Sequence, residues 1–240
     1  MATVLIVRHG RTHANAAGVL PGWAPGVRLD ETGRAQATAL GQRLVGSGLA
    51  VCRVVTSPLP RCVQTAELLA HPLGEGLPVL SDERLAECRF GAWTGRTLAD
   101  LAGDPLWRVV QDQPSAAVFP DGPDFAGESL AAMAARVVAA VREHDAAVTA
   151  QAGPGAVWVA VSHGDPVKAL LADALGLHLD LFQRITVDPA SVSVVRYGPR
   201  RPFVVRVNDV GGDLGGVLGA PDGGGDAAVG GGAGAPAPAG

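Results

Sequence analysis

The sequence predicts an α/β fold, a three-layer sandwich in which helices cover both faces of a mostly parallel central sheet. Short apolar runs rich in β-branched residues alternate along the chain with longer runs rich in Ala and Leu. The 240 residues suffice for one such domain with a sizeable core. Hydrophobic residues make up 48% of the chain and the formal net charge is only -4, so a disordered chain and a nucleic-acid partner are not expected.

The apolar runs predict five strands, which are Thr3–Arg8, Val51–Thr56, Ala156–Val161, Val192–Arg196 and Phe203–Val207. The helical patterns predict four long helices, which are Thr32–Val45, Pro60–Ala70, Ser129–Thr149 and Pro166–Leu175. Between Arg96 and Gly127 the pattern is weaker and indicates short helices around Leu98 and Trp107, followed by a loop. No window has the roughly 18 to 20 consecutive apolar residues of a membrane-spanning helix.

The composition divides the chain into a folded domain, residues 1–210, and a Gly/Pro/Ala-rich tail, residues 211–240. The tail holds 13 of the 33 glycines and no basic residue. Such a segment buries too little apolar surface to offset the entropy lost on ordering, so we expect it to be disordered. We therefore also expect that deletion after Gly211 leaves folding and activity largely unchanged.

The cysteines and the N-terminus bear on the compartment. The three cysteines are odd in number and form no CxxC pair, which disfavours a disulfide framework or a zinc site. The chain starts directly with an apolar strand pattern and shows no basic, long-apolar and cleavable sequence of a signal peptide. We therefore expect a cytoplasmic protein with no membrane partner.

Polar residues follow three predicted strands at their carboxyl ends. The first strand ends in Arg8-His9-Gly10, and His163-Gly164 follows the third. Arg61 falls in the first turn of the helix after the second strand, where it can face an anion together with the helix N-terminus. Because ligands of open α/β sheets bind beyond the carboxyl ends of strands, these groups are expected to share one cleft.

Four segments occur in the order found in one enzyme family. They read RHGRTHAN (residues 8–15), SPLPRCVQTA (57–66), LAECRFGAWTG (85–95) and VSHG (161–164). Together they resemble the RHGxTxxN opening, the SPLxRxxQTA segment, the acid segment and the second histidine of the histidine phosphatase, or phosphoglycerate mutase-like, superfamily. The resemblance spans residues 8 to 164 and leaves the tail uncovered.

The resemblance implies that His9 attacks phosphorus and becomes a phosphohistidine. Arg8, Arg61 and His163 would contact the non-bridging phosphoryl oxygens, and Glu87 would protonate the leaving oxygen and later deprotonate the acceptor. General chemistry agrees, because neighbouring cations lower the pKa of an imidazole and keep it neutral, while burial raises the pKa of a carboxyl group. This scheme requires no metal and no cofactor.

The resemblance further places Asn15, Gly22 and Gly164 at the phosphate. The structural alternatives are that Asn15 only caps a turn and that Trp23, beside Gly22, serves simple packing. Cys62 and Cys88, next to the two proposed site residues Arg61 and Glu87, are expected to face elsewhere.

The acceptor of the phosphoryl group is the least determined feature. Phosphoglycerate mutases of this family, as the resemblance implies, carry Lys and paired Arg residues after the acid segment, whereas residues 96–127 hold only Arg96 and Arg108. This favours a phosphatase acting on a small phosphate monoester with water as acceptor, with a phosphomutase as the alternative. A non-catalytic phosphate-binding protein is disfavoured because all the proposed catalytic residues are present, and a metal site at the histidines because two Arg would repel a cation. A homodimer is compatible with the resemblance.

Overall fold

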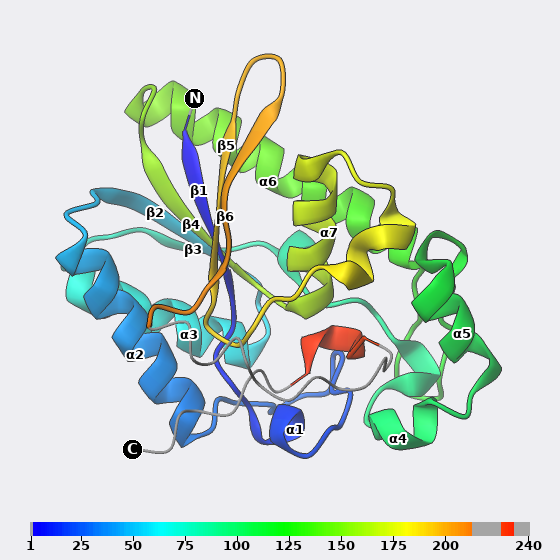
Figure 1. The fold of residues 1–240 in the computed structure, drawn as a ribbon. Helices are drawn as coiled ribbons and strands as arrows, with labels where there is room; N and C mark the ends of the chain where they lie inside the picture. The colour runs from blue at the N-terminus through cyan, green and yellow to red at the C-terminus, as the bar shows by residue number, and fades with distance from the viewer. Residues whose placement is uncertain (1, 213–226, 233–240) are drawn as a thin grey trace.

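The computed structural model describes residues 2–212 and 227–232 and contains one six-stranded sheet in the order β3-β2-β4-β1-β5-β6 (Figure 1). The strands are β1 Thr3–Arg8, β2 Val51–Thr56, β3 Val79–Ser81, β4 Val157–Ser162, β5 Val192–Tyr197 and β6 Pro202–Asp209. β1, β2, β3 and β4 run parallel, β5 is antiparallel to β1, and β6 is antiparallel to β5. The predicted α/β class with a mostly parallel sheet is confirmed.

The sequence did not predict β3 or the antiparallel direction of β5. β3 has only three residues, all of them exposed, so it lacks the buried apolar run by which a central strand is recognised. The direction of β5 depends on the path of the chain after α7, and strand periodicity carries no information about it. β3 is an edge strand, whereas β5 pairs directly with β1 inside the sheet.

Helices cover both faces of the sheet. The α-helices are α1 His13–Ala16, α2 Glu31–Gly46, α3 Pro60–Ala70, α4 Leu98–Leu101, α5 Pro105–Asp112, α6 Leu130–Ala152 and α7 Gly164–Leu175. Short 3-10 helices are His71–Leu73, Glu83–Leu85, Gly91–Trp93, Pro114–Ala116, Leu179–Arg184 and Val229–Gly231. None of the helices within these described residues is long and apolar enough to cross a membrane.

Alternation along the strands builds one core on each face. Val54 and Val159 pack with the apolar side chains of α2 and α3, whereas Val55 and Ala160 pack with those of α6 and α7. The four long helices begin and end within about three residues of their predicted bounds, a normal uncertainty for helix ends. Ser129 caps α6 by accepting a hydrogen bond from the Ala132 amide at 3.0 Å.

The predicted tail is described in part. Residues 213–226 and 233–240 lie outside the described residues, so the expected disorder is not tested there. Residues 227–232 differ from that expectation, because they form a packed 3-10 turn in which Val229 is only 2% exposed. Three glycines at φ +71°, +84° and +58° allow the backbone of this turn to bond to the domain, a contribution that a count of apolar side chains does not include.

Candidate active site

The carboxyl ends of β2, β4 and β1 lie side by side at one edge of the sheet. Arg8 pairs with Ser162 across β1 and β4, and Thr56 pairs with Val161 across β2 and β4. The residues that follow these strands therefore meet. The rings of His9 and His163 lie with their centroids 5.2 Å apart in an edge-to-face arrangement.

His9 is held in a defined tautomer. Its Nδ1 lies 2.7 Å from the Gly10 carbonyl oxygen, which can only accept, so Nδ1 carries the proton and Nε2 keeps its lone pair. Burial, followed by Arg61 and Arg8, holds the pKa of His9 well below its usual range. The ring is thus neutral at pH 7. Gly10 is required at this turn, because a Cβ there would lie 2.4 Å from the Gly33 carbonyl oxygen.

Arg61 stands in the first turn of α3 with a fully buried guanidinium. Its Nη2 donates to the Gly22 carbonyl oxygen at 2.9 Å, while Nε and Nη1 are buried with no hydrogen-bond partner among the described residues. Gly22 adopts φ +48°. The contact recorded for Gly22, which was predicted to bind phosphate, is thus one that orients Arg61.

Arg8 is equally buried but has partners. Nη1 donates to the carbonyl oxygens of Val187 at 2.9 Å and Gly231 at 2.6 Å, and Nη2 donates to Gly232 at 2.5 Å. Burial lowers the pKa of Arg8 to about 10, so the group stays charged at neutral pH. Two of its three bonds therefore go to the C-terminal segment.

Glu87 lines a small cavity together with His9 and Arg61, and its side chain is almost fully buried. Burial, and next the neighbouring Asp165, raises the pKa of Glu87 to about 8, so the carboxyl group holds a proton at neutral pH. Trp23 Nε1 and Arg136 Nη2 both donate to the Glu87 carbonyl oxygen, at 2.7 Å and 2.9 Å. Arg136 also donates to the Ala86 carbonyl oxygen at 2.8 Å, and so fixes the backbone of the acid segment.

His163 occupies the N-cap position of α7 and is completely buried. Its Nε2 lies 2.8 Å from Ser57 Oγ and 3.3 Å from Cys62 Sγ. Burial, then Arg61, holds the pKa of His163 well below its usual range. The expectation that Cys62 faces away from the site is wrong, because α3 begins directly below the strand end and turns this side chain toward His163.

Asn15 and Gly164 lie at the rim of the site. Asn15 Oδ1 accepts from the Thr12 amide at 3.1 Å and from Thr12 Oγ1 at 2.8 Å, which is the capping alternative, and the residue also lines the cavity. Gly164 is covered by Gly230, whose carbonyl oxygen would lie 2.2 Å from a Cβ at position 164. Among residues 2–212 and 227–232 no cluster of three or more His, Cys, Asp or Glu side chains could hold a metal ion.

Comparison with known proteins assigns the family. The family model described as histidine phosphatase superfamily (branch 1) matches residues 4–210. The chain belongs to the histidine phosphatase superfamily. This confirms the family expected from the four segments, and the matched range includes the whole described site except residues 227–232.

Relatives within the superfamily carry different activities in their names. The chain is 34% identical over 198 residues to the bifunctional protein Rv2228c of Mycobacterium tuberculosis, covering 81% of this chain and 50% of that protein. It thus spans about half the length of this relative. A 2,3-bisphosphoglycerate-dependent phosphoglycerate mutase of Sphingopyxis alaskensis is 28% identical, covering 87% and 94% of the two chains. The structure of a mycobacterial glucosyl-3-phosphoglycerate phosphatase superposes with a TM-score of 0.73 at 28% identity, covering 86% and 99%.

Several contributors to this histidine phosphatase site were missed from the sequence. Asp165 and Lys168 sit in the first turns of α7 and are buried beside the site, although "DPVK" directly follows the second His-Gly pair. Lys168 is the single lysine of the chain, which was a usable signal. The sequence signal for Arg136 was Glu128, an acidic residue eight positions earlier, whose carboxylate accepts a hydrogen bond from Arg136.

Proposed function

We propose that this chain hydrolyses a small phosphate monoester through a phosphohistidine on His9. The observation that carries the proposal is a pair of buried Arg61 nitrogens, without a partner among the residues that the structure describes, next to a neutral His9 ring. A buried donor without a partner is costly, so a fold retains it chiefly where a ligand supplies the acceptor. Phosphoryl oxygens suit the planar guanidinium.

In the first step His9 Nε2 attacks phosphorus, and the P–N bond forms as the ester P–O bond breaks. The leaving oxygen takes the proton of the Glu87 carboxyl group, which its raised pKa keeps available at neutral pH. Arg8, Arg61 and His163 are proposed to surround the equatorial oxygens and stabilise their charge.

In the second step the Glu87 carboxylate removes a proton from water, and the water oxygen attacks phosphorus. The P–N bond breaks, which releases inorganic phosphate and restores neutral His9 and protonated Glu87. Asn15 and the backbone at Gly22 and Gly164 are proposed to border the phosphate-binding site.

The three free cysteines, two of them buried, support a reducing cytoplasmic location.

A phosphomutase is the alternative, because the Sphingopyxis relative is named a phosphoglycerate mutase. The lack of Lys and of paired Arg in residues 96–127 supports the phosphatase. Release of inorganic phosphate from a panel of esters, assayed with and without 2,3-bisphosphoglycerate, separates the two. Release that is independent of bisphosphoglycerate supports the phosphatase, and isomerisation of 3-phosphoglycerate without release contradicts it.

A further inference from the structure

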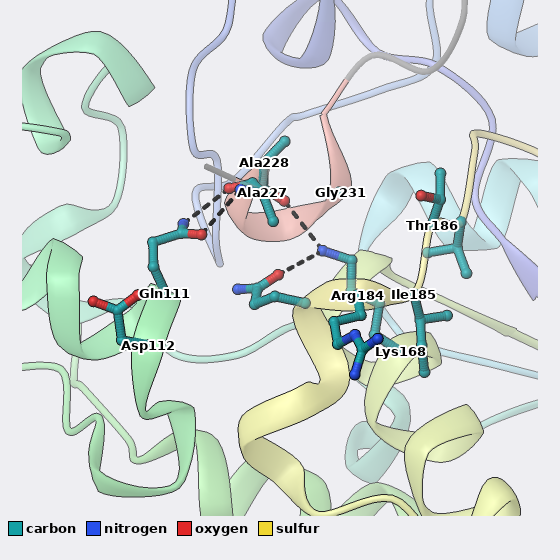
Figure 2. A pocket seen from close by; sticks show the side chains of 11 residues that line it. Gln111, Asp112, Lys168, Arg184, Ile185, Thr186, Ala227, Ala228 and Gly231 are labelled. Atoms are coloured by element: carbon teal, nitrogen blue, oxygen red, sulfur yellow. Dashed lines mark hydrogen bonds between the residues drawn. The ribbon is translucent and has the colours of Figure 1, made fainter. Parts of the chain in front are cut away.

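The described C-terminal segment, residues 227–232, lies directly on the candidate active site, and we call it the C-terminal strap. It is anchored at one end by Gln111 of α5, whose side-chain amide bonds both the N–H and the C=O of Ala227 at 2.9 Å (Figure 2). Val229, at its middle, is buried in the apolar core. The strap is therefore a specifically bound segment.

Buried charged groups of the domain bond to the strap backbone. Arg8 donates to Gly231 and Gly232, Lys168 Nζ donates to the Ala228 carbonyl oxygen at 3.2 Å, and Asp165 Oδ1 accepts from the Gly230 amide at 3.1 Å. These three side chains are at most 3% exposed. If the strap moved away, Arg8 would keep only its bond to Val187, whereas Lys168 would keep Gln183 at 2.9 Å and Asp165 at 3.6 Å. Because a buried charge is costly without enough partners, a ligand that replaces the strap should supply acceptors at these cations.

The strap separates two cavities. On one side His9, Arg61 and Glu87 line a cavity of ≈ 10 Å³ whose far wall is formed by strap residues. That space holds about one water molecule, so a phosphate ester reaches His9 only if part of the wall moves, and Val229, Gly230 and Gly232 of the strap belong to that wall. On the other side, residues including Gln111, Lys168 and Gln183 line a cavity of ≈ 420 Å³ (Figure 2).

We propose that the surface formed by Lys168, Gln183 and Gln111 is the leaving-group subsite of the enzyme, and that the strap occupies it until substrate displaces it. This inference rests on the phosphatase function proposed above and names the substrate class. With the strap displaced, the two cavities join into one, with the phosphate seat at Arg8 and Arg61 and the leaving-group surface at Lys168.

The strap itself indicates the chemistry of the ligand. Two of its carbonyl oxygens, on residues three positions apart, accept hydrogen bonds from the cations Arg8 and Lys168. Between them Asp165 accepts a hydrogen bond from an N–H. A phosphate ester of a small hydroxy acid or amino acid matches this pattern, with its phosphate at Arg8, its carboxylate at Lys168 and a hydroxyl or ammonium group at Asp165.

The ligand class is tested on the full-length His9→Ala chain, in which no phosphohistidine forms, by titration calorimetry. O-phosphoserine and O-phosphoethanolamine share the phosphate and the amine and differ by the carboxylate. We expect O-phosphoserine to bind at least about tenfold more tightly, and Lys168→Gln, made in this background, to remove that preference while Lys168→Arg keeps it. Equal affinities of the His9→Ala chain for the two esters would overturn the subsite, whether or not the Lys168 variants fold.

Displacement of the strap is tested with Gly230→Pro in the same background. Proline cannot adopt φ +71° and lacks the N–H that bonds Asp165, so the strap should detach. The matched control is Gly48→Pro, at φ +69° beyond the end of α2, where the N–H is also bonded and no atom lies within 4 Å of a Cβ. We expect O-phosphoserine to bind at least about tenfold more tightly to Gly230→Pro and unchanged to the control. Unchanged or weaker binding to Gly230→Pro would show that the strap does not compete with substrate.

These two binding tests can be distinguished from a failure of the proposed phosphatase function. The dissociation constants require no turnover, whereas failure of the phosphatase proposal appears as an unaltered chain that releases no phosphate from any ester. The strap also reverses one expectation from the sequence. Its contacts lead us to expect that deletion after Gly211 alters substrate affinity.

Discussion

Arg61 and Arg8 both lie buried beside His9, yet their hydrogen bonding differs. Arg61 has two nitrogens, Nε and Nη1, without a partner among the described residues. Arg8 has only Nε in that state, and both of its terminal nitrogens donate to backbone carbonyl oxygens. The Arg61 half of the site is prepared for an incoming anion, and the Arg8 half is covered by the chain itself. Two buried cations in one site can thus differ, because one retains donors without a partner among the described residues while the terminal nitrogens of the other bond the main chain.

The largest effect on activity is expected at His9, beside which both arginines lie. His9→Ala removes the proposed nucleophile, so phosphate release should fall on the order of 10⁴-fold or more. His13→Ala, which removes an exposed histidine of α1, is the control and should keep the rate. The measurement is kcat for an aryl phosphate, with circular dichroism to verify the fold. A His9→Ala chain that keeps most of its activity would show that neither half serves a phosphohistidine.

The two arginines themselves should separate in stability. Each change to Met removes a proposed phosphate contact and should lower kcat/KM by about 10²- to 10³-fold. Arg8→Met also leaves the carbonyl oxygens of Val187, Gly231 and Gly232 without this donor and should cost about 2 kcal/mol or more of unfolding free energy. Arg61→Met removes one bond to Gly22 and two buried donors that have no partner among the described residues, so the net change in unfolding free energy should be neutral or stabilising.

Urea denaturation of the two Met variants measures that difference. Equal destabilisation of both would break the comparison, because it would mean that Arg61 is as fully bonded in solution as Arg8. A destabilised Arg61→Met beside a neutral Arg8→Met would reverse it.

The pH dependence sharpens the role of the cavity between them. Glu87 donates only while protonated, and it loses its proton as the pH rises through about 8, so kcat/KM should fall above that value. His9 attacks only while neutral, and its lowered pKa places the loss on the acid side below its ordinary range. A pH profile of kcat/KM checks both limbs, with Glu87→Gln expected to lose the alkaline one. A profile that stays flat to pH 9 would contradict this role of Glu87.

The smallest effect is expected at the backbone support of Glu87. Trp23→Phe removes one donor to the Glu87 carbonyl oxygen, but Arg136 still donates to that oxygen. The cost should be about 1 kcal/mol in unfolding free energy, measured by urea denaturation. The change in kcat/KM should stay below that of either Arg variant. A loss as large as that of Arg61→Met would place Trp23 among the groups that bind substrate.

The Arg61 half could be predicted from the sequence because its parts are local. Strand ends, a helix start and the glycine after each histidine lie within a few residues of the groups they position, and Gly10 is required by a backbone contact of its own turn. The Arg8 half could not, since its partners are backbone carbonyl oxygens more than 170 residues away, and a carbonyl group leaves no residue-specific trace. The partner of Arg61, Gly22, was singled out, but for contact with phosphate.

The same distinction explains the fold. The four central strands and the long helices follow from periodic burial, whereas the exposed β3 and the direction of β5 depend on the course of the chain. The glycine-rich strap reads as disorder by composition because its bonds use main-chain atoms. Lys168, buried in a chain with no other lysine, was the one available signal that this half of the site has its own chemistry.

The central claim is tested most directly by trapping the intermediate. The protein is mixed rapidly with a phosphate monoester, quenched in alkali to preserve phosphohistidine, and digested for mass spectrometry. We expect one phosphoryl group on the peptide that carries His9, formed and lost at rates that match turnover. Turnover with no label on His9, or with the label on another side chain, would contradict it.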